Sequence, residues 1–330
     1  MKEILNYLYS HKTLTRKQSA EVLTNIAEGK YNNSQIASFI SVYIMRSITV
    51  DELAGFRDAL MGLYVPIDLS EFNTIDMCGT GGDGKDTFNI STLSSFILAA
   101  AGEKVSKHGN YGVSSNCGSS NIMETVGYKF SADPAKLKKE ISQAGICYLH
   151  APLVNPAMKN VAPVRKELGV KTFFNMLGPM VNPTAPRNQV VGVYNLDLAR
   201  LYTYIYQQTD KEFCIVHNLD GYDEVSLTSD FKMITNHSEM IIKPEDLGLK
   251  RLKPDDLHGG KTVEESVKMF NAILKGNGTK EQNEVVAVNS ALGLKCLHPE
   301  RSLGDCIQTT RNILLSGKGY EVLMKLISLQ

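Results

Sequence analysis

The chain has 330 residues, of which 43% are hydrophobic and 21% charged, a composition typical of a globular protein with one large or two smaller domains. Lysine and arginine together number 35, as do aspartate and glutamate, so the formal net charge is zero. Nucleic-acid-binding proteins usually carry a basic surplus or a basic stripe, and neither is visible here. A polyanionic ligand would therefore need something other than net charge to hold it, and a metal ion is the natural candidate.

The six cysteines are widely spread with no Cys-x-x-Cys pair, so zinc spacing is absent and a disulfide framework is not expected. A thiol nucleophile is conceivable at Cys78 or Cys117, but no His-Asn or His-Asp partner pattern accompanies them. The first residues lack the pattern of a signal peptide, and the longest apolar stretch, around 96–101, is too short to span a bilayer. The sequence therefore predicts a cytoplasmic protein.

Residues 1–70 are predicted to be wholly helical. Capping boxes mark two helix starts, at Thr15 with Gln18 and at Thr49 with Glu52. Ser34 is predicted to cap a third helix. Gly29 is predicted to end the helix before it. A bundle this short buries little surface alone, so we expect it to pack on a partner element or a second subunit.

From Asn73 onward, strands alternate with helices, which indicates a mainly parallel sheet flanked by helices. The ligands of such sheets bind beyond the carboxyl ends of the strands. The predicted strands are 74–78, 104–107, 146–150, 189–194, 213–218 and 232–235. The predicted helices are 91–101, one after Ser119, 135–144 behind the cap Asp133-Pro134, 197–207, 263–275, 282–294 and 303–316.

The stretch 155–183 interrupts this alternation with four prolines and is predicted to form short helices joined by proline turns, one of them over 156–168. We expect it to cross back to the helical part, leaving the active site in the cleft between the two. The predicted fold is α/β, with a small all-helical domain and a large domain whose mainly parallel central sheet is flanked by helices. The predicted boundaries are 1–70 with 156–183 for the helical domain, and 71–155 with 184–330 for the α/β domain.

Three loops of small residues follow one another between Asp76 and Gly127. The first reads Gly79-Thr80-Gly81-Gly82-Asp83-Gly84, and its glycines allow backbone N–H groups to approach an anion closely. It is not a Walker loop, because no Gly-Lys-Ser/Thr follows, and its third glycine is misplaced for a dinucleotide fingerprint. Three such loops in about 50 residues favour a site for a phosphorylated sugar over plain turns.

The second loop, Asn89-Ile90-Ser91-Thr92, opens a predicted helix whose N-terminus would point at the same place. Ser91 and Thr92 are candidates for binding phosphate oxygens, and Ser91 also for a metal, although both Asn89 and Ser91 could simply cap a helix. The third loop begins at Lys107-His108-Gly109-Asn110 and runs on through Ser120. Lys107 would supply a point charge for a phosphate, against the alternative that a lone lysine is solvated surface.

Two further motifs have charged side chains. Asp223-Glu224 follows a predicted strand, and adjacent carboxylates there suit Mg²⁺ bound together with substrate phosphates; the alternative is an acidic surface turn. Arg165 lies on the predicted helix 156–168, where its guanidinium could clamp a carboxylate or form a surface salt bridge.

Together these motifs resemble the anthranilate phosphoribosyltransferase family over essentially the whole chain, in matching order and spacing. The segments that carry the resemblance are 76–84, 89–92, 107–110, 156–159, 161–165, 174–179 and 220–224. It implies transfer of the phosphoribosyl group of 5-phosphoribosyl 1-diphosphate to the amino group of anthranilate, with release of diphosphate, in tryptophan biosynthesis. It also implies Mg²⁺, two ions per subunit, and a homodimer formed through the helical domain. The balanced charge and the short apolar stretches predict no nucleic-acid or membrane partner.

The resemblance also assigns roles to individual residues. The implied metal ligands are Ser91, Asp223 and Glu224, and the implied anthranilate contacts are Gly79, Asn110 and Arg165. The implied phosphoribosyl diphosphate contacts are Gly79, Gly82, Asp83, Thr87, Asn89, Ile90, Ser91, Thr92, Lys107, Ser115 and Ser119. No catalytic base is implied, because catalysis would rest on positioning and on stabilising the leaving diphosphate.

The sequence departs from the family pattern at three places. Asn155 stands where a histidine is usual, Tyr111 where an arginine is frequent, and Ser120-Asn121 where Ala-Asp is usual. These departures leave the donor residues intact and affect the expected acceptor affinity or specificity.

Two alternative functions stay open at this point. A pyrimidine nucleoside phosphorylase has a similar fold and a Lys-His-Gly-like loop, but the Asp223-Glu224 pair suits diphosphate and metal better than inorganic phosphate. A non-enzymatic relative could bind nucleic acid in the same cleft, against which the zero net charge argues.

Overall fold

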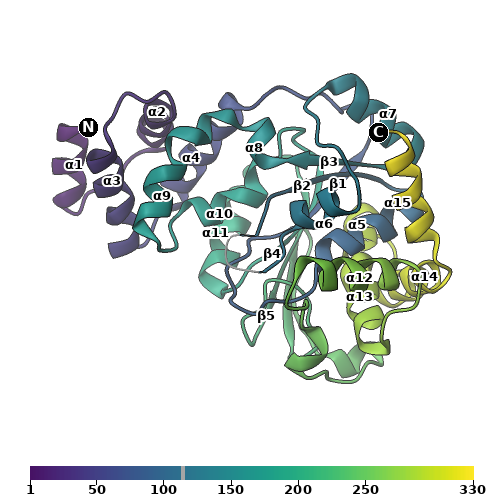
Figure 1. Cartoon of the computed structure of the whole chain (residues 1–330). Coiled ribbons are helices and arrows are strands. Elements are labelled where there is room, and N and C mark those ends of the chain that lie inside the picture. The colour runs from purple at the N-terminus through teal and green to yellow at the C-terminus, as the bar shows by residue number, and fades with distance from the viewer. Residues whose placement is uncertain (113–115) are drawn as a thin grey trace. The chain divides into compact units, whose positions relative to one another are not determined.

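The computed structural model describes residues 1–112 and 116–330 (Figure 1). The chain forms two compact units: unit 1 comprises Met1–Pro66 and Pro152–Pro183, and unit 2 comprises Ile67–Ala151 and Thr184–Gln330. The chain therefore passes between the units three times. Among the described residues, no helix is long and apolar enough to cross a membrane.

Unit 1 is helical. The predicted capping boxes at Thr15 and Thr49 are confirmed, and Gly29 adopts a positive φ of 75° just after the second helix ends. The third helix is capped by Asn32 rather than the predicted Ser34, because Gln35 lies three residues after Asn32 and completes a reciprocal box. The elements are α1 (Lys2–Tyr9), α2 (Arg16–Ala27), α3 (Asn33–Met45), α4 (Val50–Leu63), α8 (Ala151–Val154), η1 (Pro156–Asn160), α9 (Ala162–Leu168), α10 (Phe174–Leu177) and η2 (Gly178–Val181).

The predicted helix over 156–168 is wrong as a single element. It divides into the 3-10 turn η1 and the helix α9, with Val161 between them. Pro163 sits in the first turn of α9, where its missing N–H costs no helical hydrogen bond, so it starts a new helix rather than continuing the old one.

The core of unit 1 is aromatic. Phe39, Tyr43, Phe56 and Phe173 are buried and contact one another edge to face or stacked, with ring centroids 4.5 to 6.2 Å apart. Phe173 comes from the returning segment 152–183, so this segment is part of the same core as the N-terminal helices.

Unit 2 is built on a seven-stranded sheet in the order β3-β2-β1-β4-β5-β6-β7. The first five strands of that order are parallel, while β6 and β7 are antiparallel to their neighbours, so the predicted mainly parallel sheet is confirmed. The strands are β1 (Thr74–Gly79), β2 (Lys104–Gly109), β3 (Ile146–His150), β4 (Asn188–Gly192), β5 (Glu212–Asn218), β6 (Phe231–Thr235) and β7 (Glu239–Ile242).

Helices cover both faces of this sheet. α5 packs on β1 and β2 and also on α13 and α15, so these three helices share a face. α11 packs on β5 from the other side, as a right-handed β4–α11–β5 crossover in the opposite direction requires. The helices are α5 (Ile90–Ala100), α6 (Ser119–Thr125), α7 (Pro134–Ala144), α11 (Leu196–Tyr206), η3 (Pro244–Leu247), η4 (Pro254–Leu257), α12 (Val263–Leu274), α13 (Lys280–Leu297), α14 (Leu303–Leu315) and α15 (Lys318–Ser328).

The sheet order creates a switch point. The chain leaves β1 toward β2 on one side, and β4 continues the sheet on the other side. At the carboxyl end of such a pair the loops diverge and leave room for a ligand. The glycine loop after β1 lies at this end.

Candidate active site

The loop after β1 has the backbone that its glycines predict. Gly81, Gly82 and Gly84 have φ values of 66°, 79° and 73°, in the left-handed region that other residues rarely adopt. A side chain at these positions would strain the loop, so the conformation depends on glycine. Thr80 Oγ1 and Asp83 Oδ2 are buried there without a hydrogen-bond partner in the described structure, which leaves polar atoms for a ligand.

Asp223 lies directly against this loop. Its Oδ2 accepts a hydrogen bond from the Gly81 N–H at 2.6 Å. A Cβ at Gly79 would lie 2.4 Å from the same oxygen, and a Cβ at Gly192 would lie 1.4 Å from the Asp223 carbonyl oxygen. The close approach of the acidic segment to the sheet edge therefore requires glycine at the ends of both β1 and β4.

Glu224 lies at the N-terminus of α5. Its Oε1 accepts a hydrogen bond from the Ser91 N–H at 2.9 Å. Asn89 occupies the N-cap position of α5, but its side chain donates to the Cys117 carbonyl at 3.1 Å instead of capping the helix. Because Glu224 does the capping, the alternative that Asn89 is merely an ordinary helix cap does not hold.

Burial raises the pKa of Asp223 well above its ordinary value, and the charges of Asp83 and Glu224 raise it further. Burial likewise raises the pKa of Glu224 to about 7. Asp83, Asp223 and Glu224 thus lie close together, and this proximity disfavours the ionised forms of Asp223 and Glu224. A bound cation would stabilise these ionised forms. Among the described residues, no group of three or more His, Cys, Asp or Glu side chains could hold a metal ion by itself. An ion here would need ligands from elsewhere, such as phosphate oxygens.

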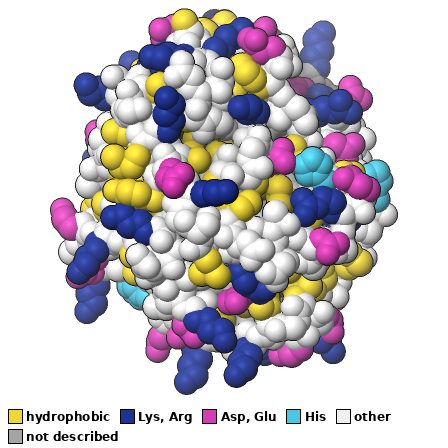
Figure 2. Space-filling model, turned by 90° about the vertical axis from the view of Figure 1, so that its right-hand side faces the viewer, with side chains coloured by type: hydrophobic (Ala, Val, Ile, Leu, Met, Phe, Trp, Pro, Cys, Tyr) yellow, Lys and Arg dark blue, Asp and Glu magenta, His cyan; other side chains and the backbone are white. Residues whose placement is uncertain are grey.

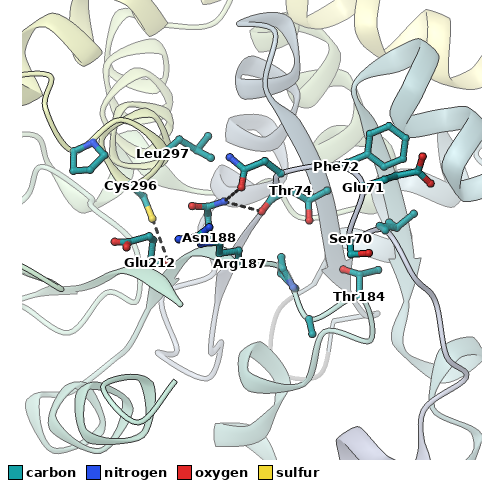
Figure 3. A pocket seen from close by; sticks show the side chains of 15 residues that line it. Ser70, Glu71, Phe72, Thr74, Thr184, Arg187, Asn188, Glu212, Cys296 and Leu297 are labelled. Atoms are coloured by element: carbon teal, nitrogen blue, oxygen red, sulfur yellow. Dashed lines mark hydrogen bonds between the residues drawn. The ribbon is translucent and has the colours of Figure 1, made fainter. Parts of the chain in front are cut away.

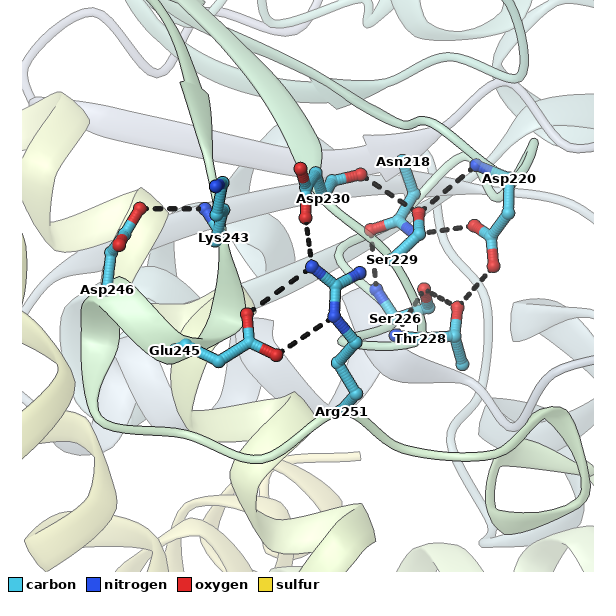
Figure 4. A network of polar contacts seen from close by, with 10 residues as sticks. All are labelled: Asn218, Asp220, Ser226, Thr228, Ser229, Asp230, Lys243, Glu245, Asp246 and Arg251. Carbon is cyan, nitrogen blue, oxygen red and sulfur yellow. Dashed lines mark hydrogen bonds and ion pairs between the residues drawn. The ribbon is translucent and has the colours of Figure 1, made fainter.

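A polar network holds the segment that carries Asp223 and Glu224 (Figure 4). Asp220 accepts hydrogen bonds from Asn218 Nδ2 at 2.6 Å and from Thr228 Oγ1 at 2.5 Å, and these bonds lower its pKa despite partial burial. On the other side, Asn289 of α13 accepts from the Val225 N–H at 3.0 Å and donates to the Val225 carbonyl at 2.8 Å. The segment is therefore tied at both ends.

Lys107 is buried, with 2% of its surface exposed, so the alternative of a solvated surface lysine does not hold. Its Nζ donates to the Met77 carbonyl at 2.6 Å and to the His108 carbonyl at 3.5 Å. The ammonium also lowers the pKa of Glu224 by its charge, against the larger effect of burial. Lys107 thus puts a positive charge under the loops, held by main-chain oxygens.

The third loop brings Asn110 and Ser119 together. Ser119 Oγ donates to the Asn110 carbonyl at 3.3 Å, and the Ser120 N–H donates to the same oxygen at 3.0 Å. Thr87 forms an isolated bridge with His258, which closes the glycine loop on its far side. Ser115 lies outside the described residues.

Two of the departures from the family pattern also lie in this loop. Tyr111 packs its ring edge on His150, 4.9 Å between centroids. Asn121 Oδ1 accepts hydrogen bonds from the N–H groups of Gly112 and Gly118 at 3.2 and 3.0 Å. Both residues therefore shape the loop from within unit 2.

Arg165 belongs to α9 of unit 1. Its guanidinium lies over the ring of Phe174, 5.1 Å from the centroid. No ion pair joins Arg165 to a carboxylate among the described residues, so the alternative of a surface salt bridge is not supported. The cation keeps its hydrogen-bond donors for another partner.

Sequence reasoning missed three contributors: Asp76, Gly192 and Asn289. Asp76 is fully buried, and its carboxylate accepts from the His108 N–H at 3.2 Å and from Gln189 Nε2 at 3.4 Å. Asp76 was within the motif, but only the strand pairing shows that it ties β1 to β2 and β4. No local signal marks Gly192 or Asn289, because both act on the chain more than 30 residues away.

The cysteines provide no nucleophile. All six are free, and burial raises the pKa of Cys78 well above its ordinary value and also raises that of Cys117. A buried thiol with a raised pKa has little thiolate at neutral pH, so the conceivable nucleophile is not supported.

A hollow of about 630 Å³ opens at the opposite, amino-terminal edge of the sheet (Figure 3). Its lining includes Thr74 and Asn188 at the starts of β1 and β4, and none of the predicted site residues. Its acids are already engaged, with Glu71 paired to Lys138 at 2.6 Å and Glu212 lying 3.8 Å from His237. The clustering of orphaned and acidic groups at the carboxyl end, not this hollow, marks the candidate active site.

Comparison with known proteins identifies the family. Residues 71–320 match the model of the glycosyl transferase family a/b domain, and residues 2–63 match its helical bundle domain. Anthranilate phosphoribosyltransferase from Flavobacterium psychrophilum is 60% identical over 99% of this chain and 98% of its own length. The corresponding protein of Flavobacterium johnsoniae is 58% identical with the same coverage. The chain belongs to the anthranilate phosphoribosyltransferase family.

Solved structures agree with this membership. The anthranilate phosphoribosyltransferase of Thermus thermophilus is 29% identical and superimposes with a TM-score of 0.92, covering 98% of both chains. The enzyme of Saccharomyces cerevisiae in complex with PRPP and Mg shares the fold, with a TM-score of 0.89 at 23% identity, over 98% of this chain and 96% of that one. The fold of a helical domain with an α/β domain is thus that of the family.

The two alternatives from the sequence find no support. The two Flavobacterium relatives are phosphoribosyltransferases and not pyrimidine nucleoside phosphorylases. On the face drawn in Figure 2, the described basic side chains alternate with acidic ones and form no continuous basic stripe. That face therefore lacks the basic stripe expected of a nucleic-acid-binding surface.

Proposed function

We propose that the loops at the carboxyl end of the unit 2 sheet bind 5-phosphoribosyl 1-diphosphate, and that this chain performs the reaction of its family there. The enzyme transfers the phosphoribosyl group to the amino group of anthranilate and releases diphosphate, a step of tryptophan biosynthesis. The proposed donor contacts are Gly79, Gly82, Asp83, Thr87, Asn89, Ile90, Ser91, Thr92, Lys107, Ser115 and Ser119.

One observation carries this proposal: the acidic segment and the glycine loop meet. The bonds Gly81 N–H to Asp223 and Ser91 N–H to Glu224 bring one buried and one partly buried carboxylate to a loop and a helix N-terminus that can bind an anion. The charge of Asp83 raises the pKa of both carboxylates, so three acids repel one another here, and a cation among them would relieve that repulsion. A diphosphate with Mg²⁺ is a ligand that satisfies both.

Magnesium fits this set of residues. The yeast relative is known in complex with PRPP and Mg, and a variant of it with Mg bound. Ser91, Asp223 and Glu224 would hold the ion, and Asp83 Oδ2, buried without a partner, could accept from one of its waters. When bound, the ion neutralises charge on the leaving diphosphate. We extend the proposal to two ions per subunit, because a diphosphate and two adjacent acids offer ligands for both.

The residues of this chain would then act by position and charge. Lys107 and the α5 N-terminus supply fixed positive potential in a region of low dielectric, where it counts most in stabilising the departing diphosphate. The glycine loop orients the donor so that C1 faces the acceptor nitrogen. The amino group of anthranilate attacks C1 as the bond to diphosphate breaks, and its proton leaves afterwards; no side chain is assigned as a base.

The proposed acceptor contacts are Gly79, Asn110 and Arg165. Arg165 Nη and Nε atoms have no carboxylate partner in the described structure, and a guanidinium pairs well with the carboxylate of anthranilate. An Arg165→Ala variant is expected to raise the KM for anthranilate about 10-fold or more while leaving the KM for the donor within about twofold. A variant that raises both equally, or that unfolds, would make Arg165 a structural residue.

The proposal also covers the assembly of the protein and the roles of its two units. We infer a homodimer formed through unit 1, whose helices α1 and α3 expose Tyr9, Ile44 and Met45. We also propose that unit 1 and unit 2 act as the helical and donor-binding domains of the enzyme. The predicted cytoplasmic location stays a prediction.

The test of the proposed function is the loss of anthranilate fluorescence on addition of phosphoribosyl diphosphate, with Mg²⁺ and with EDTA in its place. We expect decay with the metal and none with the chelator. Donor binding without decay would mean a different acceptor, with Asn155 as the first residue to examine. Absence of any donor binding would overturn the loop assignment.

A further inference from the structure

A cluster of hydroxyl groups lies behind the third loop, and of its members only Ser119 has a role in the site proposed above. Tyr148 is on β3 with 1% of its surface exposed, and its hydroxyl lies 2.8 Å from Ser119 Oγ and 3.0 Å from Ser120 Oγ. Ser120 is fully buried, and its Oγ lies 2.8 Å from His150 Nδ1. Four polar groups therefore form a continuous chain from the loop into the interior of unit 2.

The backbone is shaped to bring these hydroxyls to the loop. A Cβ at Gly109 would lie 2.2 Å from the Tyr148 hydroxyl oxygen and 2.3 Å from Ser119 Oγ. Glycine at the end of β2 is thus what lets both hydroxyls pass under the main chain. Ser119 Oγ also lies 3.3 Å from the Asn110 carbonyl, so the cluster joins the end of β2, the start of α6 and the end of β3.

Aromatic packing fixes the position of the cluster. Phe130 stacks on His150 with ring centroids 4.2 Å apart and lies 5.7 Å from the ring of Tyr148. Tyr128 contacts Tyr148 edge to face at 6.0 Å. Burial raises the pKa of Tyr148, so its hydroxyl keeps its proton at neutral pH. The result is a neutral, rigidly held hydroxyl beside a serine at the edge of the loop.

We propose that Tyr148 is a positioning residue for the phosphoribosyl diphosphate donor, and that it acts by holding the Ser119 hydroxyl. The inference rests on the proposed function, in which Ser119 contacts the donor. Because Ser119 Oγ donates its own proton to the Asn110 carbonyl, it can accept a hydrogen bond from the Tyr148 hydroxyl, which keeps the oxygen in place and lets Ser119 donate to a phosphate oxygen instead. A hydroxyl that accepts one hydrogen bond while it donates another is strengthened as a donor. The bond from Ser119 to Asn110, at 3.3 Å, is long enough to be exchanged for a phosphate.

Ser120 gives this chain a second anchor for the same hydroxyl. Its Oγ and His150 stand on the inner side of Tyr148, so the tyrosine ring is held from both sides of its oxygen. Ser120→Ala removes only the inner anchor, and we expect it to change the KM for the donor by about twofold or less.

The main experiment compares Tyr148→Phe with wild type in steady-state kinetics of the full-length enzyme with Mg²⁺. The substitution keeps the buried ring and removes one oxygen. We expect the KM for phosphoribosyl diphosphate to rise about 3- to 10-fold and the KM for anthranilate to stay within about twofold. Tyr206→Phe is the matched control. Tyr206 lies on α11, is as buried as Tyr148, and donates its hydroxyl to Gln189 Oε1 at 2.9 Å.

A double-mutant cycle with Ser119→Ala shows whether Tyr148 acts through Ser119. If it does, Tyr148→Phe has no further effect on the donor KM once Ser119 is alanine. Additive effects would overturn the proposal while leaving the proposed function intact, because the wild type would still turn over both substrates. A Tyr148→Phe protein that unfolds while Tyr206→Phe folds would also overturn it, since the hydroxyl would then hold the fold and not the donor. If wild type binds no donor, the proposed function fails first.

Discussion

Asp223 and Glu224 lie beside each other and beside Asp83, and the repulsion among these acids is the basis of the first prediction. Asp223→Asn and Glu224→Gln keep an oxygen that can accept the N–H of Gly81 or Ser91, but they remove the charge that a cation needs. We expect kcat to fall about 10²- to 10³-fold in each variant, with the melting temperature unchanged or raised. Turnover is followed by anthranilate fluorescence and folding by circular dichroism.

Asp230→Asn is the control for these two variants. Asp230 lies on the same loop but pairs with Arg251, which also binds Glu245 (Figure 4). We expect its kcat to stay within about twofold of wild type. Full activity in Asp223→Asn or Glu224→Gln would remove both acids from the proposed metal site.

The sequence could predict these residues singly but not their contacts. Asp223, Glu224, Ser91 and Lys107 stand in recognisable motifs, and their residue types indicate their chemistry. Their partners lie up to 142 residues away, as in the bond from Gly81 to Asp223, and no local rule reports such a pairing. For the same reason a buried Lys107 could not be told from a surface one, because its burial comes from neighbouring strands.

At the scale of elements, the carboxyl end of β4 leaves no room for a side chain beside the segment that carries Asp223 and Glu224. A Cβ at Gly192 would lie 1.4 Å from the Asp223 carbonyl oxygen, so Gly192→Ala must push that segment away from the sheet. We expect a loss of about 1 to 3 kcal/mol in the free energy of unfolding and at least about a 10-fold loss of kcat/KM for the donor. Urea denaturation and steady-state kinetics measure the two effects.

Gly304→Ala provides the comparison, because a Cβ there meets only Ser302 Oγ at 3.9 Å in α14. An alanine in a helix with free space is expected to stabilise by about 0.5 to 1 kcal/mol and to leave the kinetics unchanged. If Gly192→Ala behaved like Gly304→Ala, the close approach at β4 would carry no functional weight.

Glu52, in the first turn of α4, supports a prediction of how the stability of the protein depends on pH. Burial of Glu52 opposes its ionisation, but hydrogen bonds from Arg46, at 2.9 and 2.5 Å, and from the N–H groups of Leu14 and Thr49 outweigh it, and its pKa lies below 4.5. A group with a lowered pKa in the folded state stabilises the protein above its unfolded pKa and loses that effect as pH falls. The free energy of unfolding of wild type should therefore exceed that of Glu52→Gln by about 1 to 3 kcal/mol at pH 7. This margin should shrink as the pH falls below about 4.5.

Chemical denaturation at a series of pH values checks this prediction. Glu284→Gln serves as the comparison, because its partner Arg311 is a partly exposed surface group. We expect this substitution to change the free energy of unfolding little at any pH. A difference between wild type and Glu52→Gln that stays constant from pH 7 to about pH 3 would mean that packing, and not the charge of Glu52, stabilises α4.

Elements with strong local signals were predicted best. β3 has the predicted bounds, and the cap Asp133 starts α7 as expected. The short edge strand β7 and the last helix α15 were missed. Three of the four residues of β7 are exposed, so no apolar alternation marks it, and its pairing with β6 alone makes it a strand. The 156–168 helix was predicted too long because Pro163 suits the first turn of a helix as well as a break.

For the whole molecule, the sequence pattern indicated the class and the mainly parallel sheet, because strands alternating with helices allow few other arrangements. It could not give the sheet order, and hence the switch point between β1 and β4, because order depends on which strands pair. The family resemblance supplied what periodicity could not, namely the reaction and the roles of single residues.

Exposed apolar side chains at the ends of α1 and α3 predict how the molecule assembles. Met45 at the end of α3 is 86% exposed, Tyr9 at the end of α1 is 56% exposed and Ile44 is 45% exposed, while α1 and α3 pack on each other. Burying such side chains against a second copy would stabilise a dimer by about 25 cal/mol for each Å² of apolar surface. An Ile44→Lys, Met45→Glu double variant should therefore sediment at half the mass of wild type.

The control is Met324→Glu, which changes a methionine that is 49% exposed on α15 of unit 2 and should leave the mass unchanged. A wild type that sediments as a monomer, or a double variant that keeps the wild-type mass, would contradict the dimer through unit 1. The proposed donor contacts all belong to unit 2, and Arg165 belongs to unit 1 of the same chain. A monomeric double variant should thus keep its KM for the donor and lose thermal stability, which would assign the dimer to the stability of the fold and the chemistry to the single chain.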